Sequence, residues 1–265
     1  MKKHILDLKV VEVVRPHERY VMLKLTNPNG ALPEMRPGQF AQLRVDGSST
    51  TFLRRPISIN FMDKKKNEVW FLVQTVGDGT RQLAKLLEGD TLNVVLPLGN
   101  GFDLEAHPAT SEKRPLLVGG GVGCAPMLYL GKTMSERGVR PYFLIGARTK
   151  GDLLQLELFA QYGDVYVTTE DGSAGEKGFV TQHTLLRDSG RFSEICCCGP
   201  KPMMMAVARY AQSSSLPCAV SLENKMACGV GACLCCVEDT QEGHVCVCSD
   251  GPVFPIEQLK WNTRP

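Results

Sequence analysis

The stretch Leu116–Pro126, LLVGGGVGCAP, joins a short apolar segment to a run of glycines and the start of a helical segment. A strand, a tight turn and a helix follow one another in this order in dinucleotide-binding units. Glycine has no side chain, so the phosphates of a dinucleotide can approach the main chain of the turn. We expect Gly120, Gly121 and Gly123 to contact a nicotinamide dinucleotide, with a plain crossover turn as the alternative.

Strand-like and helix-like segments alternate along residues 103–215, which predicts a Rossmann-like parallel sheet and an NAD-binding α/β domain. Cys198 and Gly199 end a late strand at the carboxyl edge of that sheet, where ligands bind, and we expect them to contact the cofactor. Gly146-Ala147-Arg148 stands where an acidic residue usually follows the second strand, which leaves NAD and NADP both open. The expected strands are Leu116–Val118, Tyr142–Ile145, Val165–Thr168 and Ile195–Cys198, and the expected helices are Pro126–Arg137, Leu153–Tyr162, a helix near Thr181–Leu186, and Pro202–Ser213.

Residues 1–102 are expected to form a small closed antiparallel β-barrel, because short alternating segments are separated there by turn residues. One short helix is expected at Thr80–Leu87, with Thr80 as its cap. The expected strands are Ile5–Val14, Tyr20–Thr26, Phe40–Val45, Pro56–Phe61, Val69–Val76 and Thr91–Leu96.

Two motifs on this barrel have the chemistry of a flavin dinucleotide site. In Arg54-Arg55-Pro56-Ile57-Ser58 an arginine can neutralise a pyrophosphate and the serine can hydrogen-bond a flavin ring edge, although surface arginines beside a strand would look the same. Gly77-Asp78-Gly79-Thr80 opens the expected helix, and N–H groups at a helix start attract anions. An ordinary hairpin turn is the alternative for these glycines.

Eleven cysteines, none before Cys124, are the unusual feature of the composition. Within residues 216–265, too few for a good core of their own, CGVGACLCC at Cys228–Cys236 is followed by Cys248. Cys228, Cys233, Cys236 and Cys248 have the C-x4-C-x2-C…C spacing of plant-type [2Fe–2S] loops, and we expect them to be the cluster ligands. A structural zinc site is the alternative, and Cys246 remains an alternative fourth ligand.

The overall composition excludes several classes of partner. The formal net charge is only +2, which favours neither nucleic acid nor an anionic membrane surface as a partner. No apolar run approaches the roughly 20 residues needed to span a bilayer. An odd number of cysteines without an export signal argues against a disulfide framework, and we expect a cytoplasmic protein.

These motifs, in this order, resemble the ferredoxin-reductase type of flavoprotein. Arg55-Pro56-Ile57-Ser58 resembles its R-x-Y-[ST], Gly120–Pro126 its G-G-x-G-x-x-P, and Cys198-Gly199-Pro200 its C-G-P. A closer resemblance covers nearly the whole chain and points to the electron-transfer subunits of type B dihydroorotate dehydrogenase. It rests on LRRPISI at 53–59, PLGNGF at 97–102, MACGVGAC at 226–233 and DGPVF at 250–254.

The resemblance implies an oxidoreductase subunit of pyrimidine biosynthesis that holds FAD, one [2Fe–2S] cluster and NAD. It implies an FMN-containing catalytic subunit as partner, in a heterotetramer with two copies of each. The stretch SDGPVF at 249–254 implies Cys248 as the fourth ligand in place of Cys246. The implied flavin contacts are Arg55, Pro56, Ile57, Ser58, Leu72, Val73, Gln74, Gly79 and Thr80.

This assignment predicts a relay without an acid/base residue. A nicotinamide exchanges two electrons at once and a cluster one at a time, and a flavin between them can do both. Two other hypotheses use the same residues. The first is a subunit of another flavin and iron–sulfur reductase, of the ferredoxin:NADP reductase or sulfide dehydrogenase type. The second is a non-catalytic interaction protein held together by zinc.

Overall fold

The computed structural model describes residues 2–104 and 113–261, and in these ranges the chain divides into two compact units. The first holds the chain up to Gly101 together with Asn224–Glu238 and Val245–Pro252. The second holds Phe102–Glu223, Asp239–His244 and the chain from Val253 on. The sequence predicted three domains, one for each cofactor, at 1–102, 103–215 and 216–265. The two compact units follow contacts within the structure, so the three-domain division by cofactor stays a prediction. Residues 105–112 of its middle domain lie outside the described residues.

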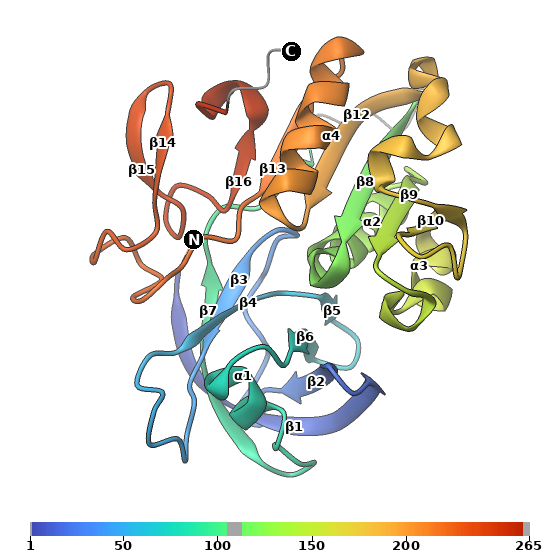
Figure 1. Cartoon of the computed structure of the whole chain (residues 1–265). Helices are drawn as coiled ribbons and strands as arrows, with labels where there is room; N and C mark the ends of the chain where they lie inside the picture. The colour runs from blue at the N-terminus through green and yellow to red at the C-terminus, as the bar shows by residue number, and fades with distance from the viewer. Residues whose placement is uncertain (1, 105–112, 262–265) are drawn as a thin grey trace. The chain divides into compact units, whose positions relative to one another are not determined.

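The first unit is built on an antiparallel sheet that has, among the described residues, seven strands in the order β4-β3-β7-β1-β2-β6-β5 (Figure 1). Lys9 of β1 pairs with Thr91 on one side and Thr26 on the other, so the long first strand changes partner at its middle and bends. Leu8 and Val10 at its middle are fully buried, whereas Ile5 near its start is exposed. The strands are β1 (His4–His17), β2 (Tyr20–Thr26), β3 (Phe40–Leu43), β4 (Arg55–Ser58), β5 (Phe61–Asp63), β6 (Glu68–Gln74) and β7 (Thr91–Leu98).

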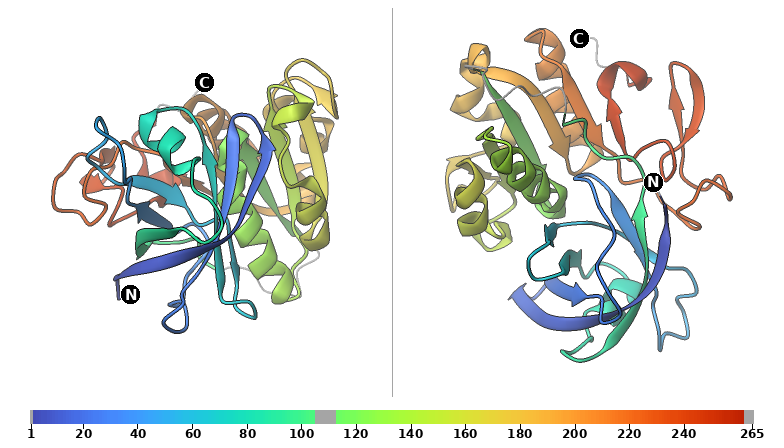
Figure 2. Two further views of the ribbon diagram at one scale, coloured as in Figure 1. Left: turned by 90° about the horizontal axis from the view of Figure 1, so that it is seen from below. Right: turned by 180° about the vertical axis from the view of Figure 1, so that it is seen from behind.

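The predicted strand Pro56–Phe61 is wrong as a single strand, since the chain changes neighbours within it. Ile59 N donates to Gln39 O and Asn60 N to Trp70 O, both at 3.0 Å. Main-chain pairing therefore passes from β3 to β6 over these two residues. They join the two edge strands of the sheet, β4 and β5, and the sheet curls into a half-barrel (Figure 2).

Helix α1 (Asp78–Leu83) begins two residues before the predicted helix and ends four residues before its predicted end. Thr80 does not occupy the cap position, which belongs to Gly77. The Thr80 hydroxyl instead lies in the first turn and accepts from the N–H groups of Val76 and Gly77, each at 3.0 Å. The helix ends early because Lys85 N and Leu86 N turn to carbonyls three residues back, those of Gln82 and Leu83.

The second unit contains the predicted parallel sheet, with the order β11-β10-β9-β8-β12-β13-β16 in the part of the chain that is described. Only β16 in this set runs antiparallel to its neighbour, β13. Helices α2 (Cys124–Glu136) and α3 (Leu156–Tyr162) cover one face and α4 (Lys201–Ser213) the other (Figures 1 and 2). The strands are β8 (Arg114–Gly120), β9 (Tyr142–Ala147), β10 (Asp164–Thr169), β11 (Glu176–Lys177), β12 (Phe192–Cys198), β13 (Cys218–Ser221) and β16 (Val253–Pro255), and a separate hairpin pairs β14 (Val237–Thr240) with β15 (Gly243–Cys246).

Two predicted helices of this unit differ from the structure. The helix near Thr181–Leu186 is replaced by two 3-10 turns, η3 (Val180–Gln182) and η4 (Thr184–Arg187). They are separated at His183, which is extended and whose Nδ1 accepts from Leu185 N at 2.9 Å, so the helix cannot run through it. The helix predicted from Leu153 begins at Leu156, because Gln155 is left-handed with φ +59°. No helix in the described ranges is both long and apolar enough to cross a membrane.

The carboxyl group of Glu194, on β12 of the second unit, makes stability depend on pH. Burial, followed by the charge of Asp103, raises the pKa of Glu194 to about 7. The folded state therefore favours the protonated form. Its contribution to stability is complete below the unfolded pKa of about 4.3 and is lost as the pH rises through the folded pKa.

We expect Glu194→Gln to be more stable than the unmodified chain at about pH 8, by on the order of 3 kcal/mol. The advantage should be much smaller at about pH 5, because the carboxyl group is then mostly protonated in the folded chain. Urea unfolding at both pH values measures this difference. An equal advantage at the two pH values would contradict the assignment.

Candidate redox cofactor sites

The two arginines of the barrel motif have different surroundings. The Arg54 guanidinium donates to Asn93 O at 3.0 Å and to Gln42 O at 3.3 Å, so it ties β7 and β3 to the start of β4. Arg55 lies against the start of α1, because a Cβ built on Gly79 would be 2.9 Å from Arg55 Cδ. Arg54 is thus part of the sheet's framework. Arg55 and Gly79 form a cradle that suits the predicted pyrophosphate.

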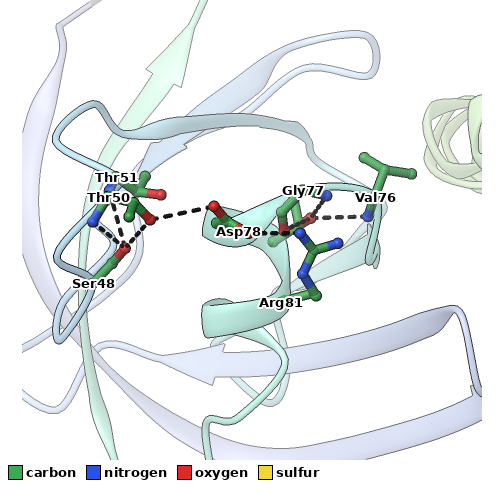
Figure 3. Close-up of polar contacts among 8 residues, drawn as sticks. Ser48, Thr50, Thr51, Val76, Gly77, Asp78 and Arg81 are labelled. Atoms are coloured by element: carbon green, nitrogen blue, oxygen red, sulfur yellow. Dashed lines mark hydrogen bonds and ion pairs between the residues drawn. The ribbon is translucent and has the colours of Figure 1, made fainter.

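A loop that contains Ser48, Thr50 and Thr51 is attached to the first turn of α1 (Figure 3). Ser48 Oγ accepts from the N–H groups of Thr50 and Thr51, and the Thr50 hydroxyl donates to Asp78 at 3.3 Å. Arg81 donates to the other oxygen of Asp78 at 2.6 Å. These hydrogen bonds, that of Arg81 foremost, lower the pKa of Asp78. The carboxylate stays ionised and paired, and it fixes the loop to the first turn of α1.

The remaining predicted flavin contacts lie on β4 and β6. Ile57 and Ser58 pair with β3, and Leu72 and Val73 are buried and pair with β2. Pairing between β5 and β6 covers only residues 68–70, so one main-chain edge of residues 72–74 has no strand partner in the described structure. A flavin ring needs such free main-chain groups together with a hydroxyl like that of Ser58. The residues present therefore fit the ring that the sequence predicts.

The glycine turn and the Cys198-Gly199 turn meet at one point of the parallel sheet. β8 lies between β9 and β12, and Gly119 pairs with Cys198. The chain moves outward from β8 through β9 on one side and from β12 through β13 on the other. Both turns therefore lie at the carboxyl ends of the strands where the strand order reverses, which is where open α/β sheets bind dinucleotides.

The glycines of this turn serve two different purposes. A Cβ on Gly123 would be 2.6 Å from Cys198 O, and one on Gly120 would overlap Met203. These two glycines are therefore needed for packing against the turn that follows β12. A Cβ on Gly121, which has φ +55°, would meet no atom within 4 Å, so a phosphate can approach there. The packing role of Met203 could not be inferred from its helical MMM run.

Cys198 is placed to contact a cofactor through its main chain. Its side chain is fully buried, and burial raises the pKa of its thiol well above the ordinary value. The thiol therefore stays neutral at physiological pH and is no nucleophile. The neighbouring Cys196 and Cys197 are buried in the same way.

The four predicted cluster ligands lie in the first unit, where main-chain N–H groups point at their sulfurs. Val230 N donates to Cys228 Sγ at 3.4 Å, and Gly231 N to Cys248 Sγ at 3.1 Å. The first of these bonds is the main cause that lowers the pKa of Cys228 to about 6. Cys248 N donates to Cys236 Sγ at 3.4 Å, which brings the third and fourth predicted ligands together.

This donor set fits a two-iron cluster, in which each iron takes two thiolates. In the described residues, no group of three or more His, Cys, Asp or Glu side chains is arranged around a single metal ion. Cys236 is buried, whereas its neighbour Cys235 is exposed. The C-x4-C-x2-C…C spacing is therefore the observation that favours the iron–sulfur hypothesis over the zinc alternative.

The surroundings of the sulfurs favour Cys248 over Cys246 as fourth ligand. Cys248 Sγ accepts an N–H bond, whereas Cys246 Sγ lies 3.9 Å from a carbonyl oxygen, that of Gly231. A thiolate is stabilised by N–H donors and repelled by a carbonyl oxygen. Burial raises the pKa of both thiols, that of Cys248 to about 12, so the N–H contact and not the pKa separates the two cysteines.

The barrel holds the segment of the fourth ligand through Asn100, a residue that the sequence analysis did not assign. Asn100 N donates to Gly251 O at 2.6 Å, and its side-chain amide donates to the carbonyls of Ser249 and Asp250 at 3.1 and 2.9 Å. These bonds fix the main chain directly after Cys248. Asn100 belongs to the motif PLGNGF, and its partners Asp250 and Gly251 belong to DGPVF. Nothing in the sequence indicates that these two motifs are in contact.

Comparison with known proteins agrees with both parts of the site. The iron–sulfur cluster binding domain of dihydroorotate dehydrogenase B matches residues 223–260, and the oxidoreductase NAD-binding domain matches residues 117–209. The electron transfer subunit of dihydroorotate dehydrogenase B (NAD(+)) from Geobacillus kaustophilus is 43% identical over 235 residues, covering 87% of this chain and 90% of the relative. That of Listeria monocytogenes is 40% identical over 263 residues, covering 96% and 98%. The chain belongs to the family of dihydroorotate dehydrogenase B electron transfer subunits.

The fold of this electron transfer subunit is also that of a solved NADH-dependent reduced ferredoxin-NADP oxidoreductase, described for flavin-based electron bifurcation. The two chains are 31% identical, with a TM-score of 0.84, and the match covers 97% of this chain and 90% of the other. The ferredoxin-reductase-like architecture predicted from the motifs is thereby confirmed.

We expect Gly123→Ala to lower the free energy of unfolding by about 3 kcal/mol, because its Cβ meets main-chain atoms that cannot move independently. Gly121→Ala is the matched control, since its Cβ meets open space and only the left-handed φ is strained, at about 1 kcal/mol. Urea unfolding of the two variants measures the difference. Equal stability would show that the two turns do not pack as described.

We expect Cys248→Ser to lose most of its iron and Cys246→Ser to retain it, because a serine hydroxyl is a poor substitute for a thiolate. Iron and acid-labile sulfide per chain, measured after anaerobic purification, decide the matter. Retention of iron by Cys248→Ser together with its loss from Cys246→Ser would reverse the choice of ligand.

Proposed function

We propose that this chain is the electron transfer subunit of an NAD-dependent dihydroorotate dehydrogenase, passing electrons from the FMN of a catalytic subunit through a [2Fe–2S] cluster and FAD to NAD+ in pyrimidine biosynthesis. The observation that carries the proposal is the loop of four cysteines between Cys228 and Cys248, whose sulfurs accept main-chain N–H groups and which lies in the same unit as the Arg55 cradle. Near-full-length identity of about 40% to subunits of that name supports it.

The chain's own contribution is positioning. Arg55 and Gly79, braced by Asp78, would hold the pyrophosphate of FAD, while Ser58 and the free edge of residues 72–74 would orient its ring. Bound FAD would supply a group that accepts electrons singly from the cluster and releases two of them together to NAD+. Proton transfer by a side chain is not needed for this exchange, which agrees with the neutral, buried thiol of Cys198.

The nucleotide would bind to the second unit at the meeting point of the two turns. Gly121 leaves room for a phosphate, and the packing of Gly120 and Gly123 against Cys198, Gly199 and Met203 keeps the two turns together. The choice of NAD over NADP rests on the relatives' name, since Gly146-Ala147-Arg148 leaves it open.

The loop of Cys228, Cys233, Cys236 and Cys248 would hold the cluster, with its N–H groups favouring the reduced, more negative state. A catalytic subunit follows from the role of the relatives as electron transfer subunits. FMN in that subunit, a heterotetramer with two copies of each chain and a cytoplasmic setting belong to the same proposal.

A second candidate is a subunit of an NADH-dependent ferredoxin-NADP oxidoreductase, favoured by the structural match to such an enzyme over 97% of the chain. Its domains are the same, so only the partner and the acceptor separate the two functions. A subunit of the sulfide dehydrogenase type would be distinguished in the same way, by the partner subunit with which the chain transfers electrons.

Anaerobic purification, followed by a visible spectrum and assays for iron and flavin, tests the proposal. We expect flavin and iron–sulfur absorption together, NADH oxidation with artificial acceptors, and no dihydroorotate turnover by the chain alone. Mixing with an FMN-containing dihydroorotate dehydrogenase subunit should couple dihydroorotate oxidation to NAD+. A colourless chain, or turnover of dihydroorotate by the single chain, would overturn the proposal.

A further inference from the structure

Gln42 of β3 contacts the first part of the cluster loop, the segment from Ala227 to Cys236. Its side chain is 1% exposed, and its Nε2 donates to Ala227 O, one residue before Cys228, at 3.5 Å. Its Oε1 is buried without a hydrogen-bond partner in the described residues. Buried amides normally satisfy both ends, so an unsatisfied oxygen at this place calls for a reason.

The main chain of Gly229 rests on the same amide. A Cβ on Gly229 would be 2.7 Å from Gln42 Cγ and 2.8 Å from Nε2. Gly229 also has φ +71°, which an L side chain rarely adopts. The residue after the first cysteine is therefore a glycine for two reasons, and one of them is the Gln42 side chain.

The main chain of Gln42 connects this loop to the flavin strand. Gln42 pairs with Pro56 of β4, and its carbonyl accepts from Arg54 at 3.3 Å. The flavin motif thus lies on one side of Gln42 and the cluster loop on the other.

We propose that Gln42 is a positioning residue that seats the cluster loop on the flavin strand and raises the reduction potential of the cluster. Its amide presents the N–H end to the loop that carries the thiolates, through the hydrogen bond to Ala227 O, and this contact leaves the oxygen without a partner among the described residues. The positive end of the amide dipole then faces the loop, and a positive potential beside a cluster favours its reduced state. This inference rests on the proposed function, because it requires the cluster.

Two isosteric variants and one control test it in the full chain. Gln42→Glu replaces the N–H end by a negative oxygen, and Gln42→Met removes the dipole at similar volume. Thr26→Val is the control, since it removes one hydrogen bond of the same sheet, from the Thr26 hydroxyl to Asn67 O at 2.8 Å, away from the loop. Iron per chain, flavin per chain and a redox titration followed by the cluster's paramagnetic signal are measured for each.

We expect Gln42→Glu to lower the ratio of reduced to oxidised cluster at least tenfold at a fixed solution potential. This corresponds to a decrease of about 59 mV in the reduction potential of the one-electron cluster. Gln42→Met should shift it in the same direction by less, and Thr26→Val not at all. Loss of iron from Gln42→Glu with flavin retained would also support the seating role. Full iron and an unchanged potential in Gln42→Met and Gln42→Glu would overturn the inference, whereas a wild-type chain without cluster would overturn the proposed function itself.

Discussion

The first unit depends on two main-chain hydrogen bonds of neighbouring residues. Ile59 N donates to Gln39 O, next to β3, and Asn60 N donates to Trp70 O on β6. Through these two bonds the two edge strands of the sheet become consecutive in sequence, and the flavin motif on β4 comes beside the free edge of β6. The neighbouring strand β3 then offers Gln42 to the cluster loop. A single curled sheet thus supplies a surface for two predicted cofactors.

The cluster loop shows how a segment with few apolar residues obtains a defined structure. Asn100 satisfies three of its main-chain groups after Cys248, and Gln42 supports it at Gly229. Its own N–H groups are directed at sulfur, which would stabilise thiolates before any metal binds. Such a site needs less rearrangement on metal binding than an unfolded loop. The loop belongs to the barrel unit by these contacts, although the sequence places it after the nucleotide-binding region.

Local patterns in the sequence located most strands of the barrel and the central strands of the parallel sheet, but they did not predict β11, β13, β14, β15 or β16. Alternation located the barrel strands, and the glycine run located the turn between β8 and α2. The failures occur where a tertiary or single-residue contact overrides the pattern, as at Ile59 and Asn60, at His183 between η3 and η4, and at left-handed Gln155. The pairings of Gly123 with Cys198 and of Asn100 with Ser249 join distant segments, and no local pattern predicts them.

The division of the chain into units bears on how the proposed relay is built. The residues assigned to FAD and to the cluster share one unit, and those assigned to the nucleotide lie in the other. Electron transfer between flavin and cluster would then depend on the register of β3 against β4, in which Gln42 lies opposite Pro56. Hydride exchange would depend on a different condition, the approach of the nucleotide to the flavin ring. Substitutions in the β3–β4 pair should therefore affect the one-electron step separately from the two-electron step, which a relay made of one continuous domain could not do.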